Sequence, residues 1–80
     1  MVILNNLNSS AINEIKVDEE TDVVSINYTS NDKFYDYTLN GVNRDDFITN
    51  VNNLKENGGS VGTTINKMIR EDQTLQLIAQ

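Results

Sequence analysis

The sequence contains no cysteine, histidine, proline or tryptophan among its 80 residues. Without cysteine, the chain cannot form a disulfide, a thiolate nucleophile or a zinc–thiolate site, so an intracellular setting is the default. Without histidine, it lacks both the usual general base near neutral pH and the most common metal ligand. These absences predict a protein that is not an enzyme and that has no metal, no cofactor and no small-molecule substrate.

Positive charge and long apolar runs are also scarce. Six Lys and Arg residues stand against twelve Asp and Glu residues, which gives a net charge of −6. Such a negative field repels phosphate backbones and anionic lipid surfaces, so it disfavours non-specific nucleic-acid binding. The apolar start at 1–4 is followed at once by Asn5 and Asn6, and it is too short for a signal peptide or a membrane span. We therefore expect a soluble, cytoplasmic protein that does not contact membranes.

What the sequence does contain is enough apolar material for one core. A chain of this length forms a single domain, and 38% of its residues are hydrophobic. We assign residues 1–80 to one domain, with its core at about 9–70 and a tail at 73–80. Such a small, Asn-rich chain also fits a bacteriophage protein, which would act in an infected bacterial cell.

Two neighbouring segments, 23–29 and 33–39, alternate apolar and polar residues with a period of two. This alternation is typical of strands that have one face in a core and one face in water. The tight connection at 30–32 would join the two segments as an antiparallel hairpin. Residues 12–17 predict a third, weaker strand, in which Ile12 is out of phase with the other apolar residues. Together the segments predict a three-stranded antiparallel β-meander.

After residue 41 the spacing of the apolar residues changes from the period of two of a strand to the spacing of a helix, and residues that typically cap helices appear. Asn43 is the candidate N-cap of a first helix, which ends near Gly58, a suitable C-terminal cap. Ser60 is the candidate N-cap of a second, shorter helix that ends near residue 70. The alternating tail at 74–79 favours an extra strand at the C-terminus. The sequence thus predicts an α+β fold: a three-stranded antiparallel β-meander packed against two short C-terminal α-helices.

Five residues are candidates for contact with a partner. Tyr35 and Tyr37 share one face of the predicted strand, where they either fill the core or form a platform for a ligand. Phe34 lies on the opposite face, so it becomes an exposed aromatic side chain if the helices cover the tyrosines. Lys67 and Arg70 lie three residues apart on the second helix and form one local basic spot, or simply a solvated helix face.

Several short motifs follow one another over about 9–70: Ser9-Ser10-Ala11-Ile12, Tyr35-Asp36-Tyr37, Gly41-Val42, Phe47, Ser60-Val61-Gly62, Ile65-Asn66 and Ile69-Arg70. In the order and spacing of these motifs the chain resembles a KTSC domain, the short module found at the end of some lysyl-tRNA synthetases and as a free-standing bacterial protein. The chain departs from the family at Asn43, where a proline is usual, and near Thr64, where an aromatic residue is usual. Because members of this family occur as part of lysyl-tRNA synthetases, the resemblance implies RNA binding.

Two functions remain as expectations. The first is a non-enzymatic interaction module that binds a protein partner, with Phe34 as the contact and sheet edges free to pair. The alternative is RNA or single-stranded nucleic-acid binding, in which Tyr35 and Tyr37 stack on bases while Lys67 and Arg70 hold phosphate. The net charge disfavours the alternative.

Overall fold

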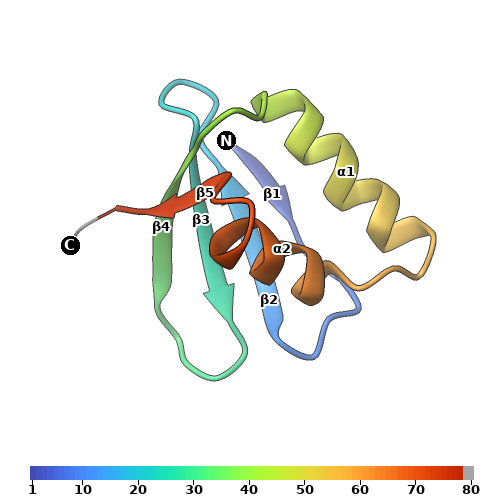
Figure 1. Cartoon of the computed structure of the whole chain (residues 1–80). Helices are drawn as coiled ribbons and strands as arrows, with labels where there is room; N and C mark the ends of the chain where they lie inside the picture. The colour runs from blue at the N-terminus through green and yellow to red at the C-terminus, as the bar shows by residue number, and fades with distance from the viewer. Residues whose placement is uncertain (79–80) are drawn as a thin grey trace.

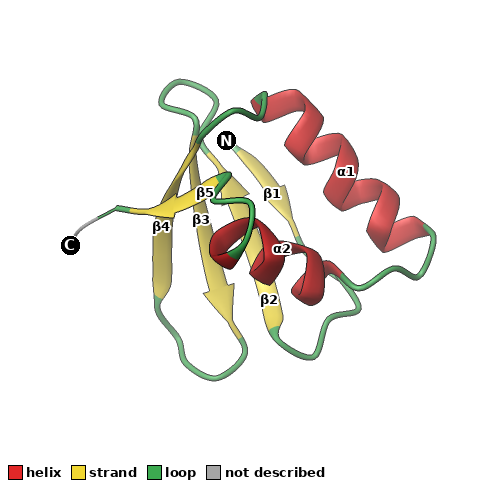
Figure 2. Ribbon diagram, in the orientation of Figure 1, coloured by secondary structure: helices red, strands yellow, loops and turns green. Residues whose placement is uncertain are grey.

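The computed structural model describes residues 1–78. In chain order its elements are β1 (Val2–Leu4), β2 (Ile12–Val17), β3 (Val23–Tyr28), β4 (Phe34–Leu39), α1 (Arg44–Glu56), α2 (Val61–Arg70) and β5 (Leu75–Leu77). The strands form one sheet in the order β1-β2-β3-β4-β5, and all neighbours are antiparallel. Both helices lie between β4 and β5 in the sequence and cover one face of the sheet (Figures 1 and 2). The predicted α+β class is confirmed.

The sheet has five strands where the sequence predicted three and a possible fourth. The extra strand at the C-terminus is confirmed as β5, and the predicted tail extends beyond it into residues 79–80, which lie outside the described part of the chain. The prediction of the strands was wrong in omitting β1, a three-residue strand that pairs with β2. Three residues are too few to show an alternation with a period of two, so the sequence pattern did not indicate this strand.

The covered face of the sheet carries the core. Ile15 lies opposite Ile26 in the register, and Val24 lies opposite Tyr37, so their side chains share one face. Ile12 also reaches the core, at 2% exposure, because the register of β2 shifts between Ile12 and residue 14. This irregularity explains why Ile12 is out of phase in the sequence, since an extra residue turns the next side chain to the other face.

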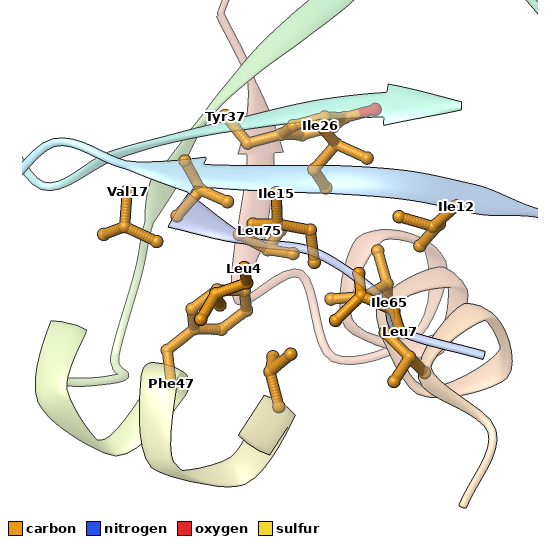
Figure 3. Close-up of a cluster of buried hydrophobic side chains, with 13 residues drawn as sticks. Leu4, Leu7, Ile12, Ile15, Val17, Ile26, Tyr37, Phe47, Ile65 and Leu75 are labelled. Carbon is orange, nitrogen blue, oxygen red and sulfur yellow. The ribbon is translucent and has the colours of Figure 1, made fainter. Parts of the chain in front are cut away.

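The helices supply the other half of the core, opposite the covered face of the sheet. Phe47 and Val51 of α1 and Ile65 of α2 are at most 2% exposed and belong to the core cluster. Phe47 and Ile65 point toward the strand side chains (Figure 3). Burial of this kind stabilises by about 1.5–3 kcal/mol for each large apolar side chain. Among the described residues, no helix is long and apolar enough to cross a membrane.

The predicted helix caps are confirmed. The Asn43 side chain accepts a hydrogen bond from the Asp45 amide at 2.7 Å, and the Ser60 hydroxyl accepts one from the Thr63 amide at 3.2 Å. At the end of α1, Gly58 has a φ of +71°, a conformation that costs glycine little. The Gly59 amide then reaches back to the Leu54 carbonyl at 2.7 Å. Such a bond ends a helix and lets the chain turn directly into α2.

Candidate functional site

The face of the sheet that the helices leave open carries a row of facing side chains. In the register, Lys16 of β2 lies opposite Ile3 of β1 on one side and Ser25 of β3 on the other. Ser25 lies opposite Asp36 of β4, and its hydroxyl donates to the Asp36 carboxylate at 2.6 Å. Phe34 belongs to the same face, two residues before Asp36 on β4. We call these five residues the Phe34 face.

A cation–π contact joins two members of the Phe34 face across the sheet. The ammonium nitrogen of Lys16 lies 4.4 Å from the centroid of the Phe34 ring. Lys16 reaches over β3 because the intervening side chain, Ser25, is small and is held by Asp36. At a partly exposed site such a contact stabilises by about 0.5–1 kcal/mol. It also holds the Phe34 ring in a defined position on an open surface.

The buried amide of Asn27 holds the hairpin that carries Phe34. Asn27 is 7% exposed and lies opposite Phe34 in the register. Its side-chain nitrogen donates to the Lys33 carbonyl at 3.0 Å and to the Asn31 carbonyl at 3.4 Å, and its oxygen accepts from the Asn13 amide at 3.0 Å. Buried polar groups persist only when they are paired in this way. The network therefore connects the β3–β4 turn to the side chain of Asn27 on β3 and, through it, to Asn13 on β2.

The tyrosines lie on the covered face of the sheet. Tyr37 is 6% exposed, and its hydroxyl is 2.8 Å from that of Tyr28. Tyr35 is partly buried, its ring centroid lies 5.9 Å from that of Tyr28, and its hydroxyl accepts from the Asn31 amide at 3.2 Å. Burial, together with the hydrogen bond to Tyr37, raises the pKa of Tyr28 well above its usual range. The three rings form a packed cluster that sequence reasoning did not assemble.

The basic pair of α2 is exposed. Lys67 and Arg70 both face water, and the Arg70 guanidinium donates to the side-chain oxygen of Asn66 at 3.0 Å. Ile65 and Ile69 turn the other side of this helix toward the core. Lys67 and Arg70 therefore lie on the outer surface of α2, whereas Tyr37 lies beneath the helical layer.

Two hollows flank the helices. A groove of about 550 Å³ runs beside the start of α2, and an apolar hollow of about 320 Å³ lies between α1 and α2. The groove is lined by Ser9 and Tyr28, among others, and the hollow by Leu54 and Met68. Sequence reasoning missed both, because the groove joins segments that are distant in the chain and the hollow depends on how the two helices pack against each other.

Close approach across the groove depends on Gly62. A Cβ atom at Gly62 would lie 3.0 Å from the Ser9 hydroxyl oxygen and 3.4 Å from the Ala11 Cβ. The Ser9 oxygen itself accepts from the amides of Ala11 and Ile12, at 3.2 and 3.1 Å. The segment before β2 thus packs directly on the backbone of α2.

A charged contact ties the acidic turn at 18–22 to the start of α1. Arg44 donates to the Glu19 carbonyl and to the Asp22 carboxylate, the latter at 3.0 Å. Within the turn, the Asp18 carboxylate accepts from the amides of residues 20 and 21, and these bonds lower its pKa. Nothing in the sequence pattern of Arg44 marked this role, since its partners lie more than 20 residues away.

No protein-family model, curated protein or solved structure matches this chain. In the described part of the chain, no group of three or more acidic side chains is placed to hold a metal ion. The Phe34 face is the open surface that combines an aromatic ring, an exposed aliphatic side chain and both signs of charge.

Proposed function

We propose that this chain is a KTSC-like, non-enzymatic interaction module that binds a protein partner in the cytoplasm through the Phe34 face. The observation that carries the proposal is the position of Phe34, a partly exposed aromatic ring on the open face, held by the Lys16 ammonium at 4.4 Å. Aromatic anchors of this kind dominate the energetics of protein interfaces. A ring that is already held in place loses little side-chain entropy on binding.

The surroundings of Phe34 also suit a protein surface. Ile3, 53% exposed, adds apolar area beside Lys16 on the same face. Asp36 and Lys16 offer one charge of each sign, and interfaces use such charges to fix the register of a partner. The matching partner surface would present an apolar patch with a carboxylate near Lys16.

The resemblance to KTSC domains is supported by a contact between two of the motifs on which it depends. Ser9 to Ala11 and Ser60 to Gly62 lie about 50 positions apart in the sequence, yet Gly62 packs against Ser9 and Ala11. Glycine suits this approach for a physical reason, because an added Cβ atom would crowd the Ser9 hydroxyl at 3.0 Å. The spacing of the resemblance thus corresponds to a contact in this fold.

The nucleic-acid alternative is not supported by this geometry. Base stacking needs an accessible aromatic face, whereas Tyr37 is 6% exposed and bonded to Tyr28. Lys67 and Arg70 are accessible, but they stand on the outer side of α2 in a molecule of net charge −6. Two exposed cations neutralise too few phosphates to offset that field.

The test compares Phe34→Ala with Thr38→Ala, a change on the same strand and the same face. Affinity capture is made from the native host's lysate, with and without nuclease, and captured proteins are identified by mass spectrometry. We expect Phe34→Ala to weaken capture by roughly 30-fold, as for a lost interface anchor, and Thr38→Ala to leave it unchanged. The captured protein should persist after nuclease treatment. Full capture by folded Phe34→Ala would exclude the Phe34 face as the site.

A further inference from the structure

Two Asn-Gly pairs follow secondary-structure elements, Asn40-Gly41 after β4 and Asn57-Gly58 after α1. All four residues are exposed. Asparagine is a thermolabile residue, because the next backbone nitrogen can attack its side-chain amide carbon, and a following glycine has no Cβ atom to obstruct that attack. A Cβ atom at Gly41 or Gly58 would have nothing within 4 Å. Both pairs are therefore open to reaction, and only the backbone around them differs.

The backbone of Asn57 is held away from the geometry that the attack needs. The five-membered ring of the product closes only when the following nitrogen turns to the side of the asparagine Cβ atom. Asn57 has a ψ of 6°, which places the Gly58 nitrogen beside the Asn57 nitrogen instead. The Asn57 amide also donates to the Asn53 carbonyl at 3.0 Å, and the Gly59 amide to the Leu54 carbonyl at 2.7 Å. Reaction at Asn57 must therefore first open the end of α1.

The backbone after Asn40 is not held in this way. The Asn40 amide donates to the Thr74 carbonyl at 2.8 Å, but within residues 1–78 no backbone hydrogen bond involves Gly41 or Val42. Gly41 has a φ of +78°, and glycine adopts either sign of φ at little cost. The peptide group between Asn40 and Gly41 can thus turn toward the Asn40 side chain without the loss of a backbone hydrogen bond.

We propose that Asn40 is a site of spontaneous deamidation and isomerisation, and that in the folded protein it reacts faster than Asn57. The Gly41 nitrogen forms a bond to Cγ of Asn40 while the bond from Cγ to the side-chain nitrogen breaks. The proton of the Gly41 amide leaves with that nitrogen as ammonia, and a cyclic succinimide remains. Water then opens the ring at either carbonyl, which yields aspartate or isoaspartate. The sequence of steps needs water and no oxidant or reductant.

The products place a new charge where three elements meet. Asn40 follows β4 and bonds to Thr74, which precedes β5, and the Thr74 amide donates to the Met68 carbonyl of α2 at 2.9 Å. Either product adds one negative charge to a chain of net charge −6. Isoaspartate also routes the backbone through the former side chain, which lengthens the connection to α1 by one carbon atom. It leaves a free α-carboxylate in an exposed turn, the group on which isoaspartate methyltransferases act.

The first experiment follows both sites during incubation of the full chain at mildly alkaline pH. Peptide mapping by mass spectrometry assigns each mass gain to Asn40 or Asn57. We expect Asn40 to react at least about fivefold faster, since reaction at Asn57 must first give up a backbone hydrogen bond. In concentrated urea, where the fold constrains neither pair, the two rates should converge. The rate at Asn40 should also rise with pH, because the attacking nitrogen must lose its proton.

The second experiment detects isoaspartate directly. An isoaspartate methyltransferase with labelled S-adenosylmethionine should label the wild type after incubation, but not the freshly purified protein. Asn40→Gln keeps a neutral amide whose longer side chain cannot close a five-membered ring, so this variant should lose most of the label. The matched control is Asn57→Gln, the same change at the other exposed pair, which should keep the label of the wild type.

The proposal fails on any of three results. One is a folded wild type in which Asn40 gains no mass while the chain in urea does. Another is a folded protein in which Asn57 reacts as fast as Asn40, or faster. The last is equal labelling of Asn40→Gln and the wild type after the same incubation. None of these outcomes depends on Phe34, so capture by the Phe34 face can fail or succeed independently.

Discussion

Gly62 shows two physical demands in conflict at one residue. It lies in the first turn of α2, where alanine would favour the helix by up to about 1 kcal/mol. The same position faces Ser9, whose hydroxyl oxygen would lie 3.0 Å from an added Cβ atom. Ser9 cannot move freely, because its oxygen accepts two backbone hydrogen bonds. We therefore expect close packing to outweigh helix propensity here.

Gly62→Ala should accordingly lower the free energy of unfolding by about 1 kcal/mol, although alanine is the better helix former. The same change made in a Ser9→Ala background should be neutral or stabilising, because the hydroxyl that collides is gone. Urea denaturation of the two single variants and the double variant measures the coupling. An identical effect of Gly62→Ala in both backgrounds would contradict the proposed contact.

Phe34 and Tyr35 show that two neighbouring residues of one strand can have opposite roles, because they lie on opposite faces of the sheet. They are neighbours on β4, yet Tyr35 packs against Tyr28 on the covered face and Phe34 meets Lys16 on the open face. Side chains alternate along a strand, so adjacent aromatic residues take opposite roles. Only the residue on the open face can anchor a partner without disturbing the core.

At the scale of elements, α1 shows that different residues can start a helix. Asn43 has φ −71° and ψ 141°, and its side chain caps the Asp45 amide at 2.7 Å. That φ is also the value that proline adopts. A proline at this position, which the resemblance to KTSC domains implies as usual, would therefore fit the backbone that Asn43 adopts here.

Asn43→Ala should lower the free energy of unfolding by about 1 kcal/mol, because the Asp45 amide loses its partner. Asn43→Pro should cost roughly half as much, since proline restricts the unfolded chain and its φ fits the folded one. Thermal and urea denaturation compare the two variants, with Thr49→Ala on the exposed face of α1 as the control. A larger loss for Asn43→Pro than for Asn43→Ala would show that the backbone there does not accept proline.

At the scale of the whole molecule, charge limits the range of partners. The net charge of −6 acts on every approaching polyanion, and the exposed cations are scattered, with Lys67 and Arg70 on the outer side of α2 and Lys33 in the connection between β3 and β4. A negative field lowers the association rate with like-charged molecules. Protein partners with a positive or neutral surface are favoured over nucleic acids.

We therefore expect no binding of single-stranded or structured RNA at about 50 mM salt, where electrostatic affinity is strong. Fluorescence anisotropy measures this directly, and the double variant Lys67→Ala/Arg70→Ala serves as the comparison. Wild type and variant should give the same flat titration. Binding that weakens with salt and disappears in the variant would instead establish the nucleic-acid function.

Local features of the fold were determined by the sequence itself. The caps at Asn43, Gly58 and Ser60 were predictable because each depends on residues within one turn of a helix. The alternation of β3 and β4 likewise placed Phe34 and Tyr35 on opposite faces. For the candidate site, the sequence therefore determined that one aromatic residue would oppose the tyrosines.

Tertiary structure alone decided which face was covered and what surrounded it. β1 exists because β2 offers it an edge, and the register shift of β2 is what returns Ile12 to the core. Lys16 reaches Phe34 only because a third strand places Ser25 between them. Such contacts join residues that are distant in the chain, and their free energy depends on how the whole sheet and its helices pack. No window of a few residues contains that information.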